Sequence, residues 1–297
     1  MAHHRRLLAG YAAVIALTGM LAGATQAVAA TQAAASQTTT FQHYVALGDS
    51  YASGPFIPNQ SLNPIGCARS DHNYAGDLAR SMGIPTLVDV SCGGAESVDM
   101  TQAQSVPLGS NPPQFNALTA NTDLVTVTIG GNDIGFTSII ETCALDSLTN
   151  PFGNPCQQHY SPGGTDQLTA AIKADGPKIA AVLSGIRQRA PHAKVVVVGY
   201  LRILPTSIGC WPVVPVSIGD VPWLGGIEQQ LNTMLGAQAK AAGDTFVNTG
   251  LPTGHDTCKP EGTKWVEGIV PTAPAFPVHP NAAGMSAVAS MIRTALG

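Results

Sequence analysis

The chain has few charged residues. Asp, Glu, Lys and Arg make up 11% of its 297 residues, whereas about a quarter is usual in soluble domains. Only 14 residues are Lys or Arg, and the formal net charge is -4. Nucleic-acid binding depends on a basic patch that neutralises phosphates. The composition therefore argues against a nucleic-acid partner and favours a neutral or apolar one.

The sequence has one long hydrophobic run, at its amino terminus, and no second one follows. Arg5 and Arg6 precede an apolar stretch over 7–23, and small residues follow it. This order is typical of a secretory signal. We predict a signal peptide over 1–30, cleaved near Ala29 or Ala30. A retained membrane anchor is the alternative, although the run is short and rich in Ala.

The rest of the chain lacks internal repeats and linker-like breaks. Residues 31–40 are Ala, Gln, Ser and Thr without periodicity, which predicts a disordered lead. We expect one domain over 41–297, and we expect the protein to be secreted and monomeric. High counts of Gly and Pro, 32 and 22, favour a loop-rich extracellular fold.

The sequence also lacks a CxxC pair. Zinc sites usually need closely spaced Cys or His ligands, so we expect no metal. In an exported protein the expected state of cysteine is the disulfide. Several connectivities are possible, and spacing alone does not choose among them. The six cysteines are Cys67, Cys92, Cys143, Cys156, Cys210 and Cys258.

The stretch GDSYASG, at 48–54, follows an apolar run over 44–47. A buried strand that ends here would bring the Ser50 hydroxyl to the rim of a sheet, where loops form active sites. Ser50 is therefore a candidate nucleophile. The alternative is that Asp49 and Ser50 only form a polar turn.

Short apolar runs alternate with stretches of helical spacing. Such alternation predicts a parallel sheet covered on both faces, a three-layer α/β/α sandwich. Two stretches, 137–164 and 205–223, resist the alternation and are predicted to be irregular loops. The expected strands are 44–47, 86–90, 124–129, 194–199 and 245–247, and the expected helices are 74–82, 165–189, 227–242 and 282–296, the last with Asn281 as its N-cap.

Polar and glycine residues follow four of the expected strands. Ligands bind beyond the carboxyl ends of parallel strands, so Ser50, 92–95, 130–133 and Tyr200 should converge. Two glycines before Asn132 permit a tight backbone that presents its amide to the crevice. The alternative for Asn132 is an Asx-turn that closes its own loop.

Four motifs together carry a resemblance to a known family. GDSYASG, CGGA, GGND and HPN occur in the order typical of SGNH (GDSL) hydrolases and span 48–281. The chain is most similar to the secreted bacterial lipases, phospholipases and esterases with three disulfides. The resemblance implies a five-stranded flavodoxin-like sheet, no metal or organic cofactor, and disulfides between cysteines that are neighbours in sequence.

The resemblance also implies roles for single residues. Ser50 would be the nucleophile, with its own N–H in the oxyanion hole. Gly94 would add a second backbone donor and Asn132 a side-chain donor, while His279 would be the general base. A serine hydroxyl needs such a base near neutral pH. Three donors at one point suit acyl transfer.

The family commonly has Asp three residues before the catalytic His, and this chain has Phe276 there. No carboxylate occurs between Glu267 and His279. We predict that a backbone carbonyl, of Phe276 or Pro277, accepts the Nδ1 hydrogen of His279 in a Ser-His dyad. Asp256 is the alternative acceptor.

Competing assignments concern a second histidine and the aspartates of the motifs. His255 is the second candidate for the base. Asp49 and Asp133 are expected to accept backbone hydrogen bonds that shape their turns, not to act as acids.

These observations predict a secreted carboxylic ester hydrolase that forms an acyl-enzyme. Lipid or acyl-chain esters are the expected substrates, with transient contact to a lipid interface; acetyl esters of polysaccharides or small molecules are the alternative. A non-catalytic secreted binding protein is the alternative of another class. The residues expected to line an acyl site, unless they pack as a small core of their own, are Ile203, Leu204, Trp211, Val213, Val214, Val216, Val221 and Trp223.

Overall fold

The computed structural model describes residues 40–297. The predicted signal peptide over 1–30 lies outside the described residues, as does all of the predicted lead over 31–40 except its last residue. None of the helices in the described part is long and apolar enough to cross a membrane.

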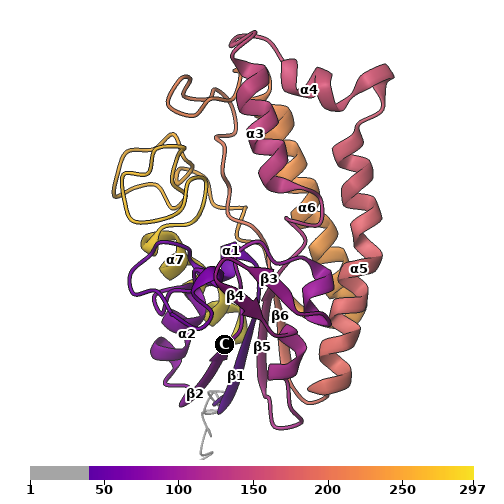
Figure 1. Ribbon diagram of the computed structural model, residues 1–297, viewed down its shortest axis with the longest axis vertical. Coiled ribbons are helices and arrows are strands. Elements are labelled where there is room, and N and C mark those ends of the chain that lie inside the picture. The colour runs from indigo at the N-terminus through magenta and orange to yellow at the C-terminus, as the bar shows by residue number, and fades with distance from the viewer. Residues whose placement is uncertain (1–39) are drawn as a thin grey trace, which may run out of the picture. The chain divides into compact units, whose positions relative to one another are not determined.

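The central sheet has five parallel strands (Figure 1). Their order is β2-β1-β5-β6-β7, which is the flavodoxin-like order of a doubly wound sheet. Strand β5 is buried along its whole length, as a strand covered on both faces should be. The strands are β1 His43–Gly48, β2 Thr86–Asp89, β5 Leu124–Thr128, β6 Lys194–Val198 and β7 Thr245–Val247.

Helices cover both faces of the sheet, so the predicted three-layer fold is confirmed (Figure 1). Helices α2 (Tyr74–Met82) and α7 (Ala282–Leu296) pack together on one face. Helices α5 (Gln167–Arg189) and α6 (Val221–Ala242) pack together on the other. Each expected helix and strand is present, with ends shifted by a few residues.

Local capping signals explain the helix ends that the sequence predicted well. Helix α2 ends at Gly83, whose φ of 64° is left-handed and suits glycine. Asn281 caps α7, because its side chain accepts a hydrogen bond from the N–H of Gly284.

The prediction of an irregular loop over 137–164 is wrong, because this stretch is mainly helical. It forms α3 (Phe136–Ser147), α4 (Pro155–Tyr160) and a short 3-10 turn. Asp220, far away in sequence, accepts hydrogen bonds from the backbone N–H groups of Cys156 and Gln157 at the start of α4. A cap from a distant segment leaves no signal in the local sequence.

The prediction for 205–223 holds until Val221, where α6 begins six residues before its expected start. Pro222 lies in the first turn of α6. Proline is tolerated there because the N–H group that it lacks would have no acceptor within the helix. The structure adds two short strands that the sequence did not signal, β3 (Gln104–Val106) and β4 (Gly109–Asn111), which form a hairpin.

Candidate active site

The first and third motifs of the site emerge from the carboxyl ends of neighbouring strands. Ser50 begins the short helix α1 (Ser50–Ser53) directly after β1, and Asn132 follows β5. The turn at Gly48 has a φ of 141°, and a Cβ there would lie 2.5 Å from the backbone oxygen of Thr128 in β5. Only glycine permits this close approach. It brings the loop that carries the serine against the strand that carries the asparagine.

Ser50 and His279 contact each other directly. The Nε2 atom of His279 lies 2.8 Å from the Oγ atom of Ser50, although the two residues are 229 positions apart in sequence. His279 is buried, and burial lowers its pKa to about 4. The imidazole is therefore neutral near pH 7, which is the form that can accept a proton.

The other ring nitrogen of His279 faces the main chain. Its Nδ1 atom lies 2.8 Å from the carbonyl oxygen of Pro277. The carbonyl of Phe276 instead accepts the backbone N–H of His279 at 3.1 Å. Of the two carbonyls considered from the sequence, that of Pro277 is the one at hydrogen-bond distance from Nδ1.

The alternative partners from the sequence lie elsewhere. The carboxylate of Asp256 accepts the N–H of Cys258 and lies near Lys259. His255 stacks on Trp265, with ring centroids 3.8 Å apart, and its Nδ1 contacts the carbonyl of Thr263. Neither residue contacts the Ser50 and His279 pair.

A buried polar network, which the sequence analysis missed, holds the loop of His279. The N–H of Glu267 donates to the carbonyl of His279 at 2.9 Å. The Glu267 carboxylate accepts from Asn281 at 2.8 Å and pairs with the buried Lys264 at 2.8 Å. Thr272 also donates to it. The spacing of Lys264 and Glu267 was the available signal, but an i, i+3 pair is common on exposed surfaces.

Each of the three donors of the expected oxyanion hole has a hydrogen that no group in the described part of the chain accepts. Within residues 40–297 the backbone N–H groups of Ser50 and Gly94 donate to no protein acceptor. Gly94 has a φ of 74°, which suits glycine. The side-chain amide of Asn132 donates one hydrogen to the carbonyl of Ala95 at 2.9 Å. Its second hydrogen stays available.

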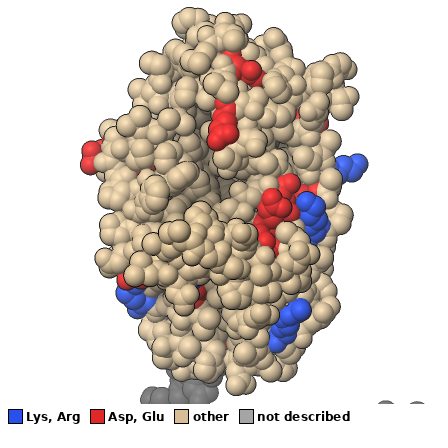
Figure 2. Space-filling view, viewed as in Figure 1, with Lys and Arg blue, Asp and Glu red and all other residues tan. Residues whose placement is uncertain are grey.

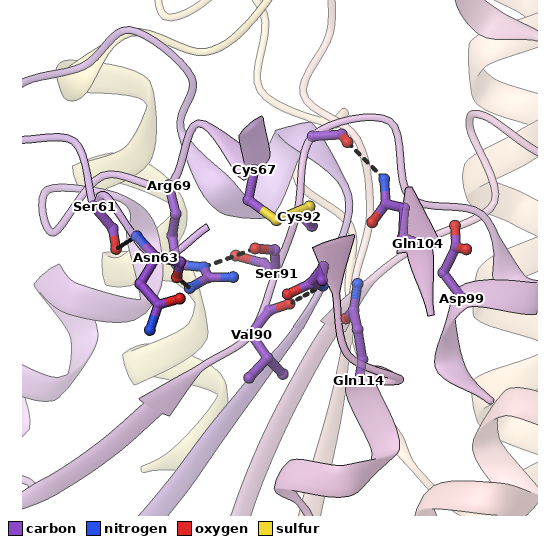
Figure 3. The surroundings of a disulfide bond; sticks show 12 residues. Ser61, Asn63, Cys67, Arg69, Val90, Ser91, Cys92, Asp99, Gln104 and Gln114 are labelled. Atoms are coloured by element: carbon purple, nitrogen blue, oxygen red, sulfur yellow. Dashed lines mark hydrogen bonds between the residues drawn. A yellow bond between two sulfur atoms is a disulfide. The ribbon is translucent and has the colours of Figure 1, made fainter. Parts of the chain in front are cut away.

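A disulfide supports the loop that carries Gly94 (Figure 3). Cys92 is joined to Cys67, and the N–H of Cys92 donates to the carbonyl of Gly48 at 2.9 Å. Gln104 Nε2 donates to the carbonyl of Gly93 at 2.8 Å. These contacts fix the second motif against the end of β1.

The other cysteines are also paired between sequence neighbours. Cys143 is joined to Cys156, which links α3 to α4, and Cys210 is joined to Cys258. All six cysteines of the chain are therefore in disulfides.

Asp49 accepts backbone hydrogen bonds, as predicted, and has a further partner. Its Oδ1 atom accepts the N–H of Tyr51, while its Oδ2 accepts the hydroxyl of Tyr200 at 2.5 Å. That hydroxyl oxygen accepts the N–H of Gly131 at 2.7 Å. Burial raises the pKa of Asp49 to about 7. The chain from Asp49 through Tyr200 to Gly131 ties together the ends of β1, β6 and β5.

Asp133, in contrast, accepts hydrogen bonds from a loop other than its own. Its carboxylate accepts the backbone N–H and the hydroxyl of Ser97, at 2.8 Å and 2.5 Å. Lys178 of α5 pairs with the same carboxylate at 3.3 Å. The prediction that Asp133 accepts a backbone hydrogen bond is therefore confirmed, but the donor is not in its own turn: Asp133 links the third motif to the segment after the second.

An apolar cavity begins beside the third motif and extends between α3 and α6. Its walls include Gly131, Tyr200, Ile140 and Leu224. Figure 2 shows a hollow on this face, surrounded mostly by uncharged surface, with acidic side chains above and beside it. The cavity therefore lies next to Asn132 in sequence, because Gly131 is one of its walls.

Two of the residues expected to line an acyl site lie in the wall of this cavity. Ile203 and Leu204 line it. The rest of the predicted set is not among its lining residues: Trp211, Val213, Val214, Val216, Val221 and Trp223. Val214, Val216 and Val221 are buried elsewhere. Helix α3, which the sequence did not predict, supplies much of the wall instead.

Comparisons with known proteins show the family of the chain. The profile of the GDSL-like lipase/acylhydrolase family matches residues 46–287. "Lipase 2" of Streptomyces coelicolor is 38% identical over 292 residues, with 96% of each chain covered. "Esterase" of Streptomyces scabiei is 30% identical, with 87% of this chain and 83% of that protein covered.

Solved structures show the same fold. The crystal structure of phospholipase A1 from Streptomyces albidoflavus has a TM-score of 0.72 and 28% identity; the match covers 86% of this chain and 99% of that one. The extracellular lipase from Streptomyces rimosus has a TM-score of 0.70, with the same identity and coverage. The chain therefore belongs to the GDSL-like lipase/acylhydrolase family and is a carboxylic ester hydrolase.

Proposed function

We propose that the protein hydrolyses esters through an acyl-enzyme formed on Ser50, with His279 as general base and the Pro277 carbonyl as its support. The single observation that carries this proposal is the line of contacts from Ser50 Oγ to His279 Nε2, and from His279 Nδ1 to the Pro277 carbonyl, each 2.8 Å long. A backbone acceptor selects the tautomer that leaves Nε2 free to take a proton.

In the first half of the reaction, Ser50 Oγ attacks the ester carbonyl carbon and its proton passes to His279 Nε2. The charge that develops on the carbonyl oxygen is stabilised by the N–H groups of Ser50 and Gly94 and by the Asn132 amide. The bond from carbon to the alcohol oxygen then breaks, and His279 returns its proton to that oxygen. The alcohol leaves, and the acyl group stays on Ser50.

In the second half, water replaces the alcohol. His279 takes a proton from the water, whose oxygen attacks the acyl carbon of the Ser50 ester. The same donors stabilise the second tetrahedral intermediate. Its collapse releases the carboxylic acid and returns the proton to Ser50 Oγ.

We propose acyl-chain esters, including lipids, as the substrate class. The apolar cavity between α3 and α6 offers an acyl chain a site that excludes water. The names of the similar proteins, lipase, esterase and phospholipase A1, agree with this class. Sugar acetates need no such cavity, so the alternative substrate class has less support.

We also propose secretion of a monomer that carries the lead over 31–40 and a single domain over 41–297 and meets lipid interfaces transiently. Three disulfides and the similarity to an extracellular lipase support export. The intact mass of protein recovered from culture medium would test cleavage near Ala29 or Ala30. Light scattering on that material would test the monomer.

A fluorophosphonate probe, which forms a bond to an activated serine, tests the nucleophile. Wild type should be labelled and Ser50→Ala should not. Ser53→Ala is a matched control in the same helix, and it should keep the label. Labelling of Ser50→Ala, or none of wild type at any pH, would refute the assignment of Ser50.

A panel of esters tests the dyad and the substrate class. His279→Ala and Asn132→Ala should each lose about 10²-fold or more in kcat, whereas Asp256→Asn, away from the pair, should lose little. Octanoyl and phospholipid esters should be preferred over acetylated sugars. A loss in Asp256→Asn equal to that in His279→Ala would contradict the dyad, and a preference for sugar acetates would favour the alternative class.

A further inference from the structure

Two chains of aromatic contacts lead away from His279 in different directions. In the first, the ring of Tyr51 lies 5.1 Å from the imidazole and continues to Tyr200 at 5.1 Å and to Phe136 at 6.1 Å. Tyr200 and Phe136 line the apolar cavity. The first chain therefore leads to the proposed acyl site.

The second chain leads to the surface. The ring of Phe276 meets the imidazole edge-on, with centroids 5.2 Å apart and an interplanar angle of 89°. Phe56, after α1, lies 5.3 Å from Phe276. The N–H of Phe276 also donates to the carbonyl of Pro55 at 2.9 Å, so the two loops are joined. In this aromatic pair, Phe276 covers one side of His279 and Phe56 packs against Phe276.

The pair is exposed although it stands beside a buried catalytic group. Phe56 is 58% exposed and Phe276 is 43% exposed, whereas His279 is 8% exposed. Phe56 also has a φ of 67°, a left-handed conformation that is uncommon for a residue with a bulky side chain. Packing against Phe276 in this conformation leaves two apolar rings open to an incoming molecule.

The chemistry of the proposed reaction decides which part of an ester meets these rings. His279 must give its proton to the alcohol oxygen, so the alcohol lies beside the imidazole when it leaves. The acyl carbon is bound to Ser50 at that moment, and its chain has the cavity available. The alcohol side is then the side of Phe276.

We propose that Phe56 and Phe276 form the binding site for an apolar alcohol portion of the ester, such as the acyl-bearing glycerol of a lipid, separate from the acyl cavity. This inference rests on the proposed acyl-enzyme reaction. Phe276 occupies the position where the family commonly has Asp, so a backbone acceptor for His279 leaves this position free to contact substrate.

The test varies one part of the ester at a time. In one series the acyl group is butanoyl and the alcohol is methyl, butyl or octyl; in the other the alcohol is methyl and the acyl chain lengthens. Phe276→Ala and Phe56→Ala are compared with wild type. Phe152→Ala is the control, because Phe152 is 78% exposed on the connection between α3 and α4.

We expect both variants to lower the preference for octyl over methyl alcohol, measured as the ratio of kcat/KM, by about 5- to 20-fold. The dependence on acyl length should follow that of wild type. Phe152→Ala should match wild type in both series. Phe56→Ala is the more telling variant, because Phe56 contacts Phe276 and not His279.

Other outcomes would overturn the inference. An equal loss for every alcohol, with a shifted pH profile in Phe276→Ala alone, would mean that the ring only shields the imidazole from water. A change in acyl preference would place the rings in the acyl site. Failure of the proposed reaction is a different result, since Ser50→Ala would then keep its activity and its probe label.

Discussion

At the scale of single residues, the site depends on main-chain groups as much as on side chains. The acceptor for His279 Nδ1 is a carbonyl, and two of the three proposed oxyanion donors are backbone N–H groups. Such groups are placed by the path of the chain, so the residues that hold the chain matter most. Tyr200 is one of these, because its hydroxyl joins Asp49 to Gly131.

Replacing Tyr200 by Phe should weaken both the fold and catalysis. The ring stays, but the N–H of Gly131 loses its acceptor and Asp49 loses a donor. An unpaired buried group costs about 1–3 kcal/mol in free energy of unfolding. Because Asn132 follows Gly131, we also expect kcat to fall about 10-fold. Urea unfolding and ester turnover would measure the two effects.

Tyr160→Phe is the matched control for Tyr200→Phe. The Tyr160 hydroxyl makes no hydrogen bond to any residue between 40 and 297, and we expect little change. A Tyr200→Phe variant with wild-type stability and turnover would show that this hydrogen-bond chain is dispensable. If kcat falls, combining the variant with Asn132→Ala should cost less than the sum of the single effects, because both act on one motif.

At the scale of elements, the disulfides hold loops at two different places. Cys67 and Cys92 lie under the oxyanion loop, where the N–H of Gly93 also donates to the carbonyl of Cys67 at 2.9 Å. Cys143 and Cys156 join α3 to α4, away from the proposed oxyanion donors. Both crosslinks constrain the unfolded chain, but only the first lies against the proposed oxyanion donors.

Removing the Cys67 and Cys92 disulfide should therefore cost activity as well as stability. Replacing both residues by Ala opens a loop of 25 residues. The loop-closure entropy of the unfolded chain predicts that this lowers the free energy of unfolding by about 3–4 kcal/mol. We expect kcat to fall further than KM rises, because Gly94 loses its support. Thermal unfolding and steady-state kinetics below the new Tm would measure both.

The double Ala variant of Cys143 and Cys156 is the control for this experiment. Its loop of 13 residues predicts a loss of about 3 kcal/mol. We expect most of its kcat to remain. Equal losses of kcat in the two variants would argue that general loosening, not the position of Gly94, limits activity.

At the scale of the whole molecule, the chain has few charged residues, and several of its carboxyl groups are buried. Burial raises the pKa of Asp49 and Asp175 to about 7 and that of Glu228 to about 8. Each raised pKa means that the folded protein favours the protonated form. Such a group stabilises the fold at pH values below its pKa in the unfolded chain. This stabilisation is lost as the pH rises through its pKa in the folded protein.

Glu228→Gln should change how stability depends on pH. Glu228 lines the apolar cavity between α3 and α6 and accepts the N–H of Ile203 at 2.9 Å, a bond that Gln can keep. Wild type should lose stability between about pH 4.5 and pH 8, where Glu228 ionises in the unfolded chain first. The variant should be more stable by about 1–3 kcal/mol above pH 8 and similar to wild type near pH 4.

Thermal unfolding over this pH range would measure the difference. Glu141→Gln, at an exposed position of α3, is the control and should follow wild type at every pH. A stability difference that stayed constant with pH would mean that Glu228 does not ionise with the raised pKa. A variant that became less stable than wild type as the pH rose would reverse the sign of the argument, whereas a shared loss from Asp49 and Asp175 is expected in both proteins.

The sequence by itself determined the layers of the fold and the order of the motifs. The hydrophobic pattern and the capping residues are local properties. The five strands could therefore be predicted from their apolar runs, and the ends of α2 and α7 from Gly83 and Asn281. The tertiary structure decided the rest. Asp220 caps α4 from a distant segment, and packing of the whole chain brought His279 to Ser50 across 229 positions. Contacts across many residues depend on how the whole chain packs, which no local pattern encodes.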